Sequence, residues 1–316
     1  MHYSINYLEL YKSKNLLIVF TIELTILYAL CFKVYNDRLS SQNMLYMQSE
    51  NIGILALLLR WLHERKMMTK KLFLTLLLLS TFTMSGTINI AVAANVSYAI
   101  DELKKEFHTL YPDTKVQVTL GSSGKLTAQI INGAPYQLFM SADMKFPSAL
   151  FKDKIAVTKP MIYAQGSLAY LSVKQRNFCA EMFLLKDKDI QKIAIANAKT
   201  APYGKAAEEA IKKSGLYESV KDKFVYAESI SQTVAYTVTA ADIGLIAKSS
   251  LYSPQMSHFK EGIHWYDVES ELYTPINQGI VILKEGENNP EVKAFHDFIL
   301  STKAQKILKD FGYLIP

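Results

Sequence analysis

The chain has 316 residues, of which half are apolar and a fifth are charged. This length fits one large domain or two ordinary ones, and the composition excludes a disordered chain, a collagen-like fibre and a membrane protein with many spans. The formal net charge is +6, but residues 1–86 hold nine Lys or Arg against five Asp or Glu, so the remainder carries only +2. A near-neutral region without basic runs argues against nucleic acid as a partner.

Residues 67–86 have the pattern of a secretory signal peptide. Met68-Thr-Lys-Lys gives a short basic start, and Leu72 to Leu79 form an apolar stretch that is too short to span a bilayer. Small residues follow near Ser85 and Gly86, where cleavage is expected. No Cys follows the apolar stretch, so we expect no lipid anchor and a periplasmic protein exported by this N-terminal signal.

Residues 1–66 precede this signal and are interpreted as an extension from a misassigned upstream start. The alternative is a membrane anchor, because residues 16–32 are apolar and long enough to cross a bilayer. Glu23 would then lie near the middle of the bilayer, at a cost of about 2.5 to 3.5 kcal/mol. That cost favours the extension.

From residue 87 onward, strand-like and helix-like patterns alternate. Short apolar runs rich in β-branched residues are each followed by a stretch with helical periodicity, and Gly, Pro or Asn marks most of the junctions. Such alternation predicts an α/β fold with largely parallel sheets. The expected strands are 88–94, 116–120, 138–140, 161–163, 168–173, 193–196, 224–226, 243–246 and 276–283, and the main expected helices are 99–110, 126–131, 205–214, 231–239, 290–300 and 303–311.

The same alternation occurs twice, which predicts two lobes. Each lobe is expected to be a mostly parallel sheet flanked by helices, with the ligand in the cleft between the lobes. The first lobe is assigned to 87–164 plus 268–316 and the second to 165–267. The hinges are expected near Ala164–Gly166 and Tyr266–Glu269.

Four short loops that join a strand to a helix are polar and uncharged at their tips. Parallel strands present their carboxyl ends at one edge of a sheet, and ligands bind there. Each loop also offers free backbone N–H groups and the positive end of a helix dipole, which suits an anion. The four loops are Ala94–Ser97, Gly121–Gly124, Pro202–Gly204 and Ser229–Ser231.

A site made of neutral donors favours a particular kind of anion. A small dianion loses hydration worth tens of kcal/mol when it is buried, and six to eight donors at roughly 1.5 to 3 kcal/mol each can offset much of this loss. Such a site suits an oxyanion that is fully deprotonated at neutral pH, such as sulfate, molybdate or tungstate. Hydrogen phosphate carries a proton that needs an acceptor, and Glu228 is the only carboxylate near these loops in the sequence.

Several runs of residues resemble a known family. Ile88 to Ala99, Gly121 to Ile130, and above all Gly133 to Asp143 resemble the periplasmic molybdate-binding proteins of ABC-type importers, and the similarity extends to the closing Phe311-Gly312-Tyr313. The resemblance implies the two-lobed fold of type II periplasmic binding proteins. It also implies that neutral groups enclose the oxyanion between the lobes.

Carried over position by position, the resemblance implies four ligand-binding residues. Asn95 and Ser123 would donate through backbone and side chain, and Tyr203 and Ile230 through backbone N–H groups. Ser122 and Ala247 are less certain. Relatives often have Ser where this chain has Asn95, whose amide can also donate. Many place a Tyr hydroxyl where this chain has Ala247, and the phenol of Tyr203 is a candidate to replace that donor.

The function implied is an extracytoplasmic receptor, not an enzyme, that binds molybdate and tungstate as transported ligands without a cofactor. The expected partners are the oxyanion and an ABC permease in the inner membrane, and the receptor itself is expected to be a monomer. The alternatives are a receptor for another tetrahedral oxyanion such as sulfate, and an exported enzyme or sensor on the same scaffold.

Three patterns bear on the enzyme alternative. Ser122-Ser-Gly-Lys125 fits the Ser-x-x-Lys pattern of penicillin-binding enzymes, but the partner motifs are missing. Asp143 is interpreted as a helix cap or an inter-lobe hydrogen-bonding group, not a catalytic carboxylate. The six His are scattered, and His258 and His264 are too far apart in the sequence for a usual metal pair. These patterns favour the receptor.

Overall fold

The computed structural model describes residues 86–316. The expected extension at 1–66 and the expected signal peptide up to residue 85 therefore lie outside the described residues. Within 86–316, the helices are all too short or too polar to cross a membrane.

The first lobe is built on a five-stranded sheet in the order β2-β1-β3-β10-β4. β1 is parallel to β2 and β3, whereas β10 is antiparallel to both β3 and β4. The strands are β1 (Thr87–Ala93), β2 (Lys115–Gly121), β3 (Leu138–Met140), β4 (Met161–Gly166) and β10 (Ile276–Ile282).

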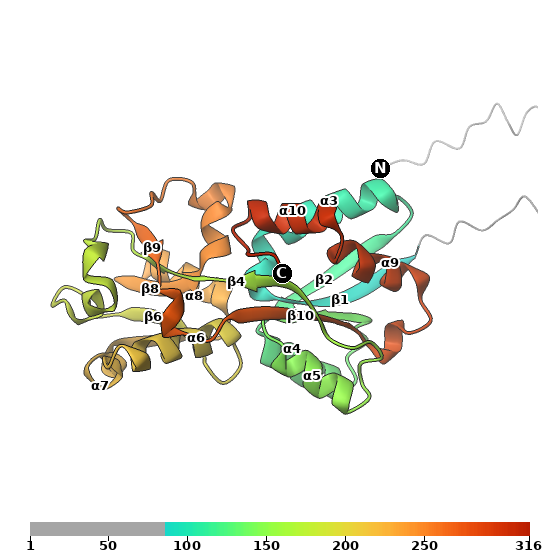
Figure 1. The fold of residues 1–316 in the computed structure, drawn as a ribbon, viewed down its shortest axis with the longest axis horizontal. Coiled ribbons are helices and arrows are strands. Elements are labelled where there is room, and N and C mark those ends of the chain that lie inside the picture. Colours follow the sequence, from blue (N-terminus) through green and yellow to red (C-terminus); the bar gives the residue numbers. More distant parts are fainter. Residues whose placement is uncertain (1–85) are drawn as a thin grey trace, which may run out of the picture. The chain divides into compact units, whose positions relative to one another are not determined.

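Helices cover both faces of this sheet (Figure 1). On one face, three helices pack around an aromatic cluster in which the ring of Phe107 lies 5.0 Å from that of Phe295 and 5.4 Å from that of Phe298. The two ends of the described chain therefore share one core. The helices on this face are α3 (Ile100–Leu110), α9 (Pro290–Ile299) and α10 (Thr302–Asp310), and those on the other are α4 (Ser123–Ile131) and α5 (Lys145–Lys152).

The second lobe repeats this arrangement in the order β7-β6-β8-β5-β9. β6 is parallel to β7 and β8, and β5 is antiparallel to β8 and β9. The strands are β5 (Leu168–Leu171), β6 (Ile193–Ala196), β7 (Phe224–Ala227), β8 (Ile243–Ala247) and β9 (Trp265–Asp267), and the helices are α6 (Pro202–Lys213), α7 (Tyr217–Val220) and α8 (Ile230–Thr239).

Short 3₁₀ helices fill several connections. They are η1 (Ala94–Tyr98), η2 (Phe178–Lys186), η3 (Lys221–Lys223), η4 (Lys248–Tyr252), η5 (Pro254–Met256), η6 (Ser270–Leu272) and η7 (Lys284–Gly286). Of these, only η1 belongs to the site described below.

The two-lobed α/β fold is confirmed, but the sheets are mixed, not mostly parallel. Each sheet has two parallel and two antiparallel pairings. The antiparallel strands are β10 and β5, and each enters its sheet directly from the other lobe. Because no helix precedes them as a crossover, these strands are free to run opposite to their neighbours.

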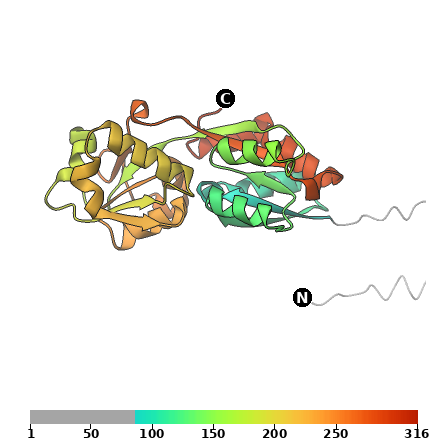
Figure 2. The ribbon, with the colours of Figure 1, turned by 90° about the horizontal axis from the view of Figure 1, so that it is seen from below.

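The chain crosses between the lobes twice, at Ser167 and through residues 268–275, as the green and orange-red segments in Figure 2 show. The hinge expected at Ala164–Gly166 is instead the end of β4, because Gln165 and Gly166 pair with β10. The first sheet thus extends two residues beyond the boundary assigned from the sequence, since the backbone of Gln165 and Gly166 pairs with Asn277 and Ile276.

Candidate functional site

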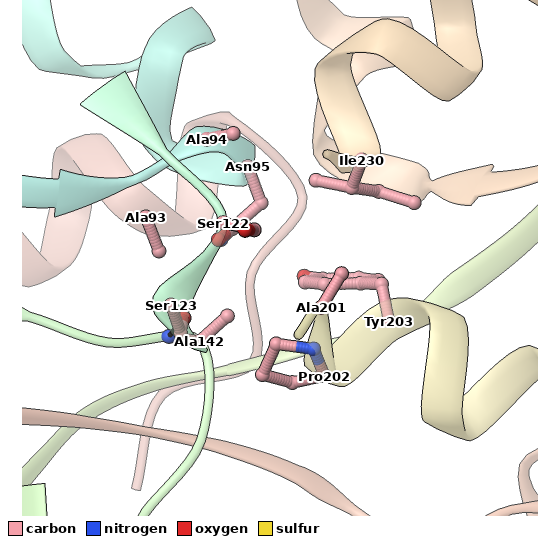
Figure 3. Close-up of a pocket in the computed structure, with 10 residues that line it drawn as sticks. All are labelled: Ala93, Ala94, Asn95, Ser122, Ser123, Ala142, Ala201, Pro202, Tyr203 and Ile230. Atoms are coloured by element: carbon pink, nitrogen blue, oxygen red, sulfur yellow. Dashed lines mark hydrogen bonds between the residues drawn. The ribbon is translucent and has the colours of Figure 1, made fainter. Parts of the chain in front are cut away.

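A small pocket lies where the N-termini of four helices meet (Figure 3). η1 and α4 contribute from the first lobe, and α6 and α8 from the second. The lining residues are Ala93, Ala94, Asn95, Ser122, Ser123, Ala142, Ala201, Pro202, Tyr203 and Ile230. All of them except Pro202 are buried.

Each of these helices follows the carboxyl end of a parallel strand. β1 leads into η1, β2 into α4, β6 into α6 and β7 into α8. Two residues fit α6 to its place: Pro202 suits the first position of a helix because it needs no N–H partner there, and Gly204 lets the helix approach β6. A Cβ on Gly204 would lie 2.2 Å from the carbonyl oxygen of Ala196.

Four buried backbone N–H groups lining the pocket have no partner among the described residues. They belong to Asn95, Ser123, Tyr203 and Ile230, and each lies in the first turn of its helix. Buried N–H groups are nearly always paired in proteins. Four of them around one cavity therefore indicate a place for an acceptor-rich ligand.

Two serine hydroxyls add donors. The hydroxyl of Ser122 is buried without a partner, because this residue precedes α4 without capping it through its side chain. Ser123 Oγ accepts a hydrogen bond from the backbone N–H of Ala142 at 3.0 Å. Its own hydrogen is therefore available to a ligand.

Asn95 lines the pocket, but its side chain is held from behind. Its Nδ2 lies 2.8 Å from Gln278 Oε1 and 3.0 Å from the hydroxyl of Tyr313. Its Oδ1 is buried without a partner. The sequence interpretation missed Gln278, although a Gln between Ile276 and Ile280 on one face of a strand is a signal for a buried polar contact.

Tyr203 contributes its backbone to the pocket, while its phenol has another partner. The hydroxyl accepts a hydrogen bond from Gln278 Nε2 at 3.2 Å. It occupies space above Gly166, where a Cβ would lie 1.9 Å from the phenolic oxygen. Burial raises the pKa of Tyr203 well above its usual value, so the phenol stays neutral.

Ala247 is the one proposed residue that does not line the pocket. It ends β8, pairs with Leu168, and belongs to the same buried apolar cluster as Tyr203. Its methyl group is a core contact of the second lobe.

Among residues 86–316, no charged side chain lines the pocket. Lys125 and Glu228, each close in sequence to a lining residue, form an exposed ion pair between the two lobes at 2.5 Å, so this carboxylate is engaged outside the pocket. Asp143 accepts from the backbone N–H of Phe146 at 3.2 Å, which agrees with its interpretation as a cap of α5. Burial raises the pKa of Asp143, and its hydrogen bonds from the Phe146 backbone and the Ser141 hydroxyl partly offset this rise.

The size and chemistry of the pocket limit what it can hold. The pocket is far too small for a drug-sized ligand, so it is suited to a much smaller species. Its polar groups are mostly donors, and the N-terminal ends of three α-helices add positive potential. Within residues 86–316, no three or more His, Cys, Asp or Glu side chains are grouped so that they could hold a metal ion.

Comparison with known proteins gives consistent matches over the described region. Residues 88–314 match the family model described as bacterial extracellular solute-binding protein. The chain is 35% identical to the molybdate-binding protein ModA of Azotobacter vinelandii over 75% of this chain and 93% of that protein. It is 34% identical to ModA of Rhodobacter capsulatus over 73% of this chain and 89% of that protein.

A solved structure shows the same fold. The periplasmic molybdate-binding protein of Azotobacter vinelandii superposes with a TM-score of 0.66 at 30% identity, covering 72% of this chain and 99% of that chain.

Proposed function

This chain belongs to the bacterial extracellular solute-binding protein family, and we propose that it is the receptor that captures molybdate for an ABC-type importer. Relatives named for molybdate binding support this ligand. Export to the periplasm and delivery to a permease in the inner membrane follow from the same proposal. The molybdate ion is cargo, and no cofactor or catalytic step is required.

The observation that carries the proposal is the set of four unpaired backbone N–H groups around a small buried cavity. Together with the hydroxyls of Ser122 and Ser123 they provide six donors that converge from both lobes. A tetrahedral oxyanion has four acceptor oxygens with several lone pairs each, so it can satisfy donors that approach from several directions. Asn95, Ser122, Ser123, Tyr203 and Ile230 are thus the proposed ligand-binding residues.

Binding of this kind requires the lobes to be closed. The backbone N–H of Gly124 in the first lobe donates to the carbonyl oxygen of Thr200 in the second at 2.8 Å. Donors from only one lobe would leave half of the oxyanion in water. We therefore propose that the ion is captured as the lobes close about the crossings at Ser167 and residues 268–275.

The test is isothermal titration of the purified protein with molybdate, tungstate, sulfate and phosphate. We expect tight binding of molybdate and tungstate, which have the same charge and shape, and weaker binding of sulfate and phosphate. If only sulfate gives binding heat, the transported ion is sulfate and not molybdate. If none of the four gives binding heat, the proposal that the protein is an oxyanion receptor is wrong.

A further inference from the structure

A buried polar cluster lies directly behind the pocket. Gln278 in β10 is its centre, because its Oε1 accepts from Asn95 Nδ2 at 2.8 Å and from the hydroxyl of Tyr163 at 2.8 Å. Its Nε2 donates to the hydroxyl of Tyr203 at 3.2 Å. All four residues are buried, and burial keeps both phenols neutral by raising their pKa. The cluster therefore links the pocket to both lobes through uncharged groups.

This arrangement of hydrogen bonds presents the wrong end of Asn95 to an anion. Both hydrogens of its Nδ2 are used, on Gln278 and on Tyr313. Its Oδ1 is left as a buried acceptor without a partner at a residue that lines the pocket (Figure 3). An oxyanion offers no hydrogen to this oxygen, so the contact would be repulsive.

Turning both amides by 180° corrects this and gives up one hydrogen bond, the one that Asn95 Nδ2 donates to the Tyr313 hydroxyl. The oxygen and nitrogen of a side-chain amide have nearly the same size, so a turn exchanges them without moving other atoms. Gln278 Nε2 would then donate to Asn95 Oδ1 and to the Tyr163 hydroxyl over the same 2.8 Å distances. The hydroxyl of Tyr203 would donate to Gln278 Oε1 over 3.2 Å.

The two other phenols of the cluster also have acceptors after the turn. Tyr163 can donate its own hydrogen to the carbonyl oxygen of Ser141, at 3.3 Å. Tyr313 donates its one hydrogen to the backbone carbonyl oxygen of Asn95 at 2.9 Å, so Gln278 is then the only donor to Asn95 Oδ1 among the described residues. Asn95 Nδ2 is then free to point a hydrogen into the pocket.

We propose that Gln278 is the positioning residue that selects the polarity of the pocket: by donating to Asn95 Oδ1, it makes Asn95 a donor toward the bound oxyanion. This rests on the proposed function, and it adds a residue that does not itself touch the ion. In the opposite orientation, Gln278 makes Asn95 an acceptor, which suits a ligand that carries a proton. The orientation of one buried amide thus separates deprotonated oxyanions from protonated ones.

Closure of the lobes completes this cluster. Tyr203 belongs to the second lobe and Gln278 to the first, so their hydrogen bond forms only when the lobes meet. The Tyr203 hydroxyl accepts from Gln278 Nε2 in the arrangement described above and would donate to Gln278 Oε1 after the turn. Closure therefore gives the Gln278 amide a partner in either orientation.

The test is a double-mutant cycle between Gln278 and Asn95 on the purified protein, with molybdate affinity measured by titration calorimetry. In Gln278→Glu, the ionised carboxylate can only accept, so it holds Asn95 Nδ2 and leaves Oδ1 toward the ion. It also adds a charge that repels the ion. The Asn95→Ala background retains the charge effect and removes the amide, so the difference between the two backgrounds isolates the orientation of Asn95.

We expect Gln278→Glu to weaken binding at least about 100-fold in the wild-type background and about 10-fold or less in the Asn95→Ala background. Equal losses in both backgrounds would mean that residue 278 acts through its charge alone, and the inference would be wrong although molybdate binding stands. If wild-type protein itself does not bind molybdate, the proposed function fails, and this inference fails with it.

A second measurement on the wild-type protein does not depend on the folding of a variant. Neutron diffraction from deuterated crystals grown with molybdate locates the deuterium atoms of both amides directly. We expect Asn95 Nδ2 toward the ion and Gln278 Nε2 toward Asn95 Oδ1. Asn95 Nδ2 still bonded to Gln278 in the complex would overturn the inference.

Discussion

Ser123 occupies the position where one hydroxyl can serve both the protein and the ligand. Its Oγ accepts from the backbone N–H of Ala142, so its hydrogen remains for the ion. We expect Ser123→Ala to weaken molybdate binding about 5- to 150-fold, which corresponds to about 1 to 3 kcal/mol. Calorimetry checks this, with the exposed Ser148→Ala as the control. An unchanged affinity in Ser123→Ala would remove this hydroxyl from the site.

Asn95 is the lining residue at which an introduced negative charge should weaken oxyanion binding most. Asn95→Asp replaces an amide of the same shape by a carboxylate that is fully buried and faces the proposed dianion. We expect a loss of affinity of at least about 1,000-fold, because like charges in a low-dielectric site repel strongly. The matched control is Asn288→Asp on the surface. Normal molybdate binding by Asn95→Asp would refute the proposed site.

At the scale of single residues, the sequence led to five of the residues that line the pocket. Small polar residues at strand-to-helix junctions carry that information locally, because a free N–H group needs only a helix start. The phenol of Tyr203 and the role of Gln278 were not predictable in this way. The first depends on a contact between residues that are 75 positions apart in the chain, and the second on a contact between residues 183 positions apart.

The N-terminus of α4 packs against the second lobe at Gly124. A Cβ on Gly124 would lie 2.9 Å from Thr200 Cα and 3.1 Å from the ring of Phe146. Gly124→Ala should therefore hold the lobes apart and weaken molybdate binding about 10-fold or more, while a helical Ala raises the stability of the free protein by up to about 1 kcal/mol. Calorimetry and thermal unfolding together test this opposite pair of changes. An equal affinity in the variant would contradict the role of this contact in closure.

The start of α5 carries a carboxyl group whose ionisation opposes folding. Burial raises the pKa of Asp143 above its usual 3.8, so the unfolded chain loses this proton at lower pH than the folded protein does. The wild-type protein should then lose stability relative to Asp143→Asn as the pH rises above 3.8. Urea unfolding of both proteins between about pH 3 and 7 measures this difference. The exposed Asp153→Asn is the control. If the stability advantage of Asp143→Asn over the wild type stays constant or shrinks as the pH rises, the prediction is wrong.

At the scale of elements, hydrophobic periodicity located most strands and helices to within a few residues. It missed β9, whose sequence Trp-Tyr-Asp lacks the continuous apolar run that marked β3. It also placed the start of α4 three residues late, because Ser123 and Gly124 are weak helix formers by themselves. The direction of β5 and β10 was not predicted, since strand direction depends on how the chain returns between the lobes.

At the scale of the whole molecule, the proposed site has no counter-charge for a dianion among residues 86–316, and this has a consequence for salt. No charged side chain of that region lines the cavity, so ionic screening should change the affinity little. We expect molybdate affinity to change less than about threefold between about 0.05 and 0.5 M NaCl, both in the wild type and in Lys125→Met. Calorimetry over this range is the measurement. A loss of about tenfold or more in salt would show that Lys125 acts as a counter-ion.

The sequence by itself determined the two-lobed α/β fold and the neutral, donor-rich character of the four loops, because both are written in local periodicity and in residue type. The tertiary structure alone decided that these loops meet around one cavity, that Ala247 lies outside it, and that Asn95 is held by Gln278. The physical reason is range: a helix start offers its N–H groups wherever it lies, but their convergence depends on strands and crossings far apart in the chain. Only the folded protein brings those parts within hydrogen-bonding distance.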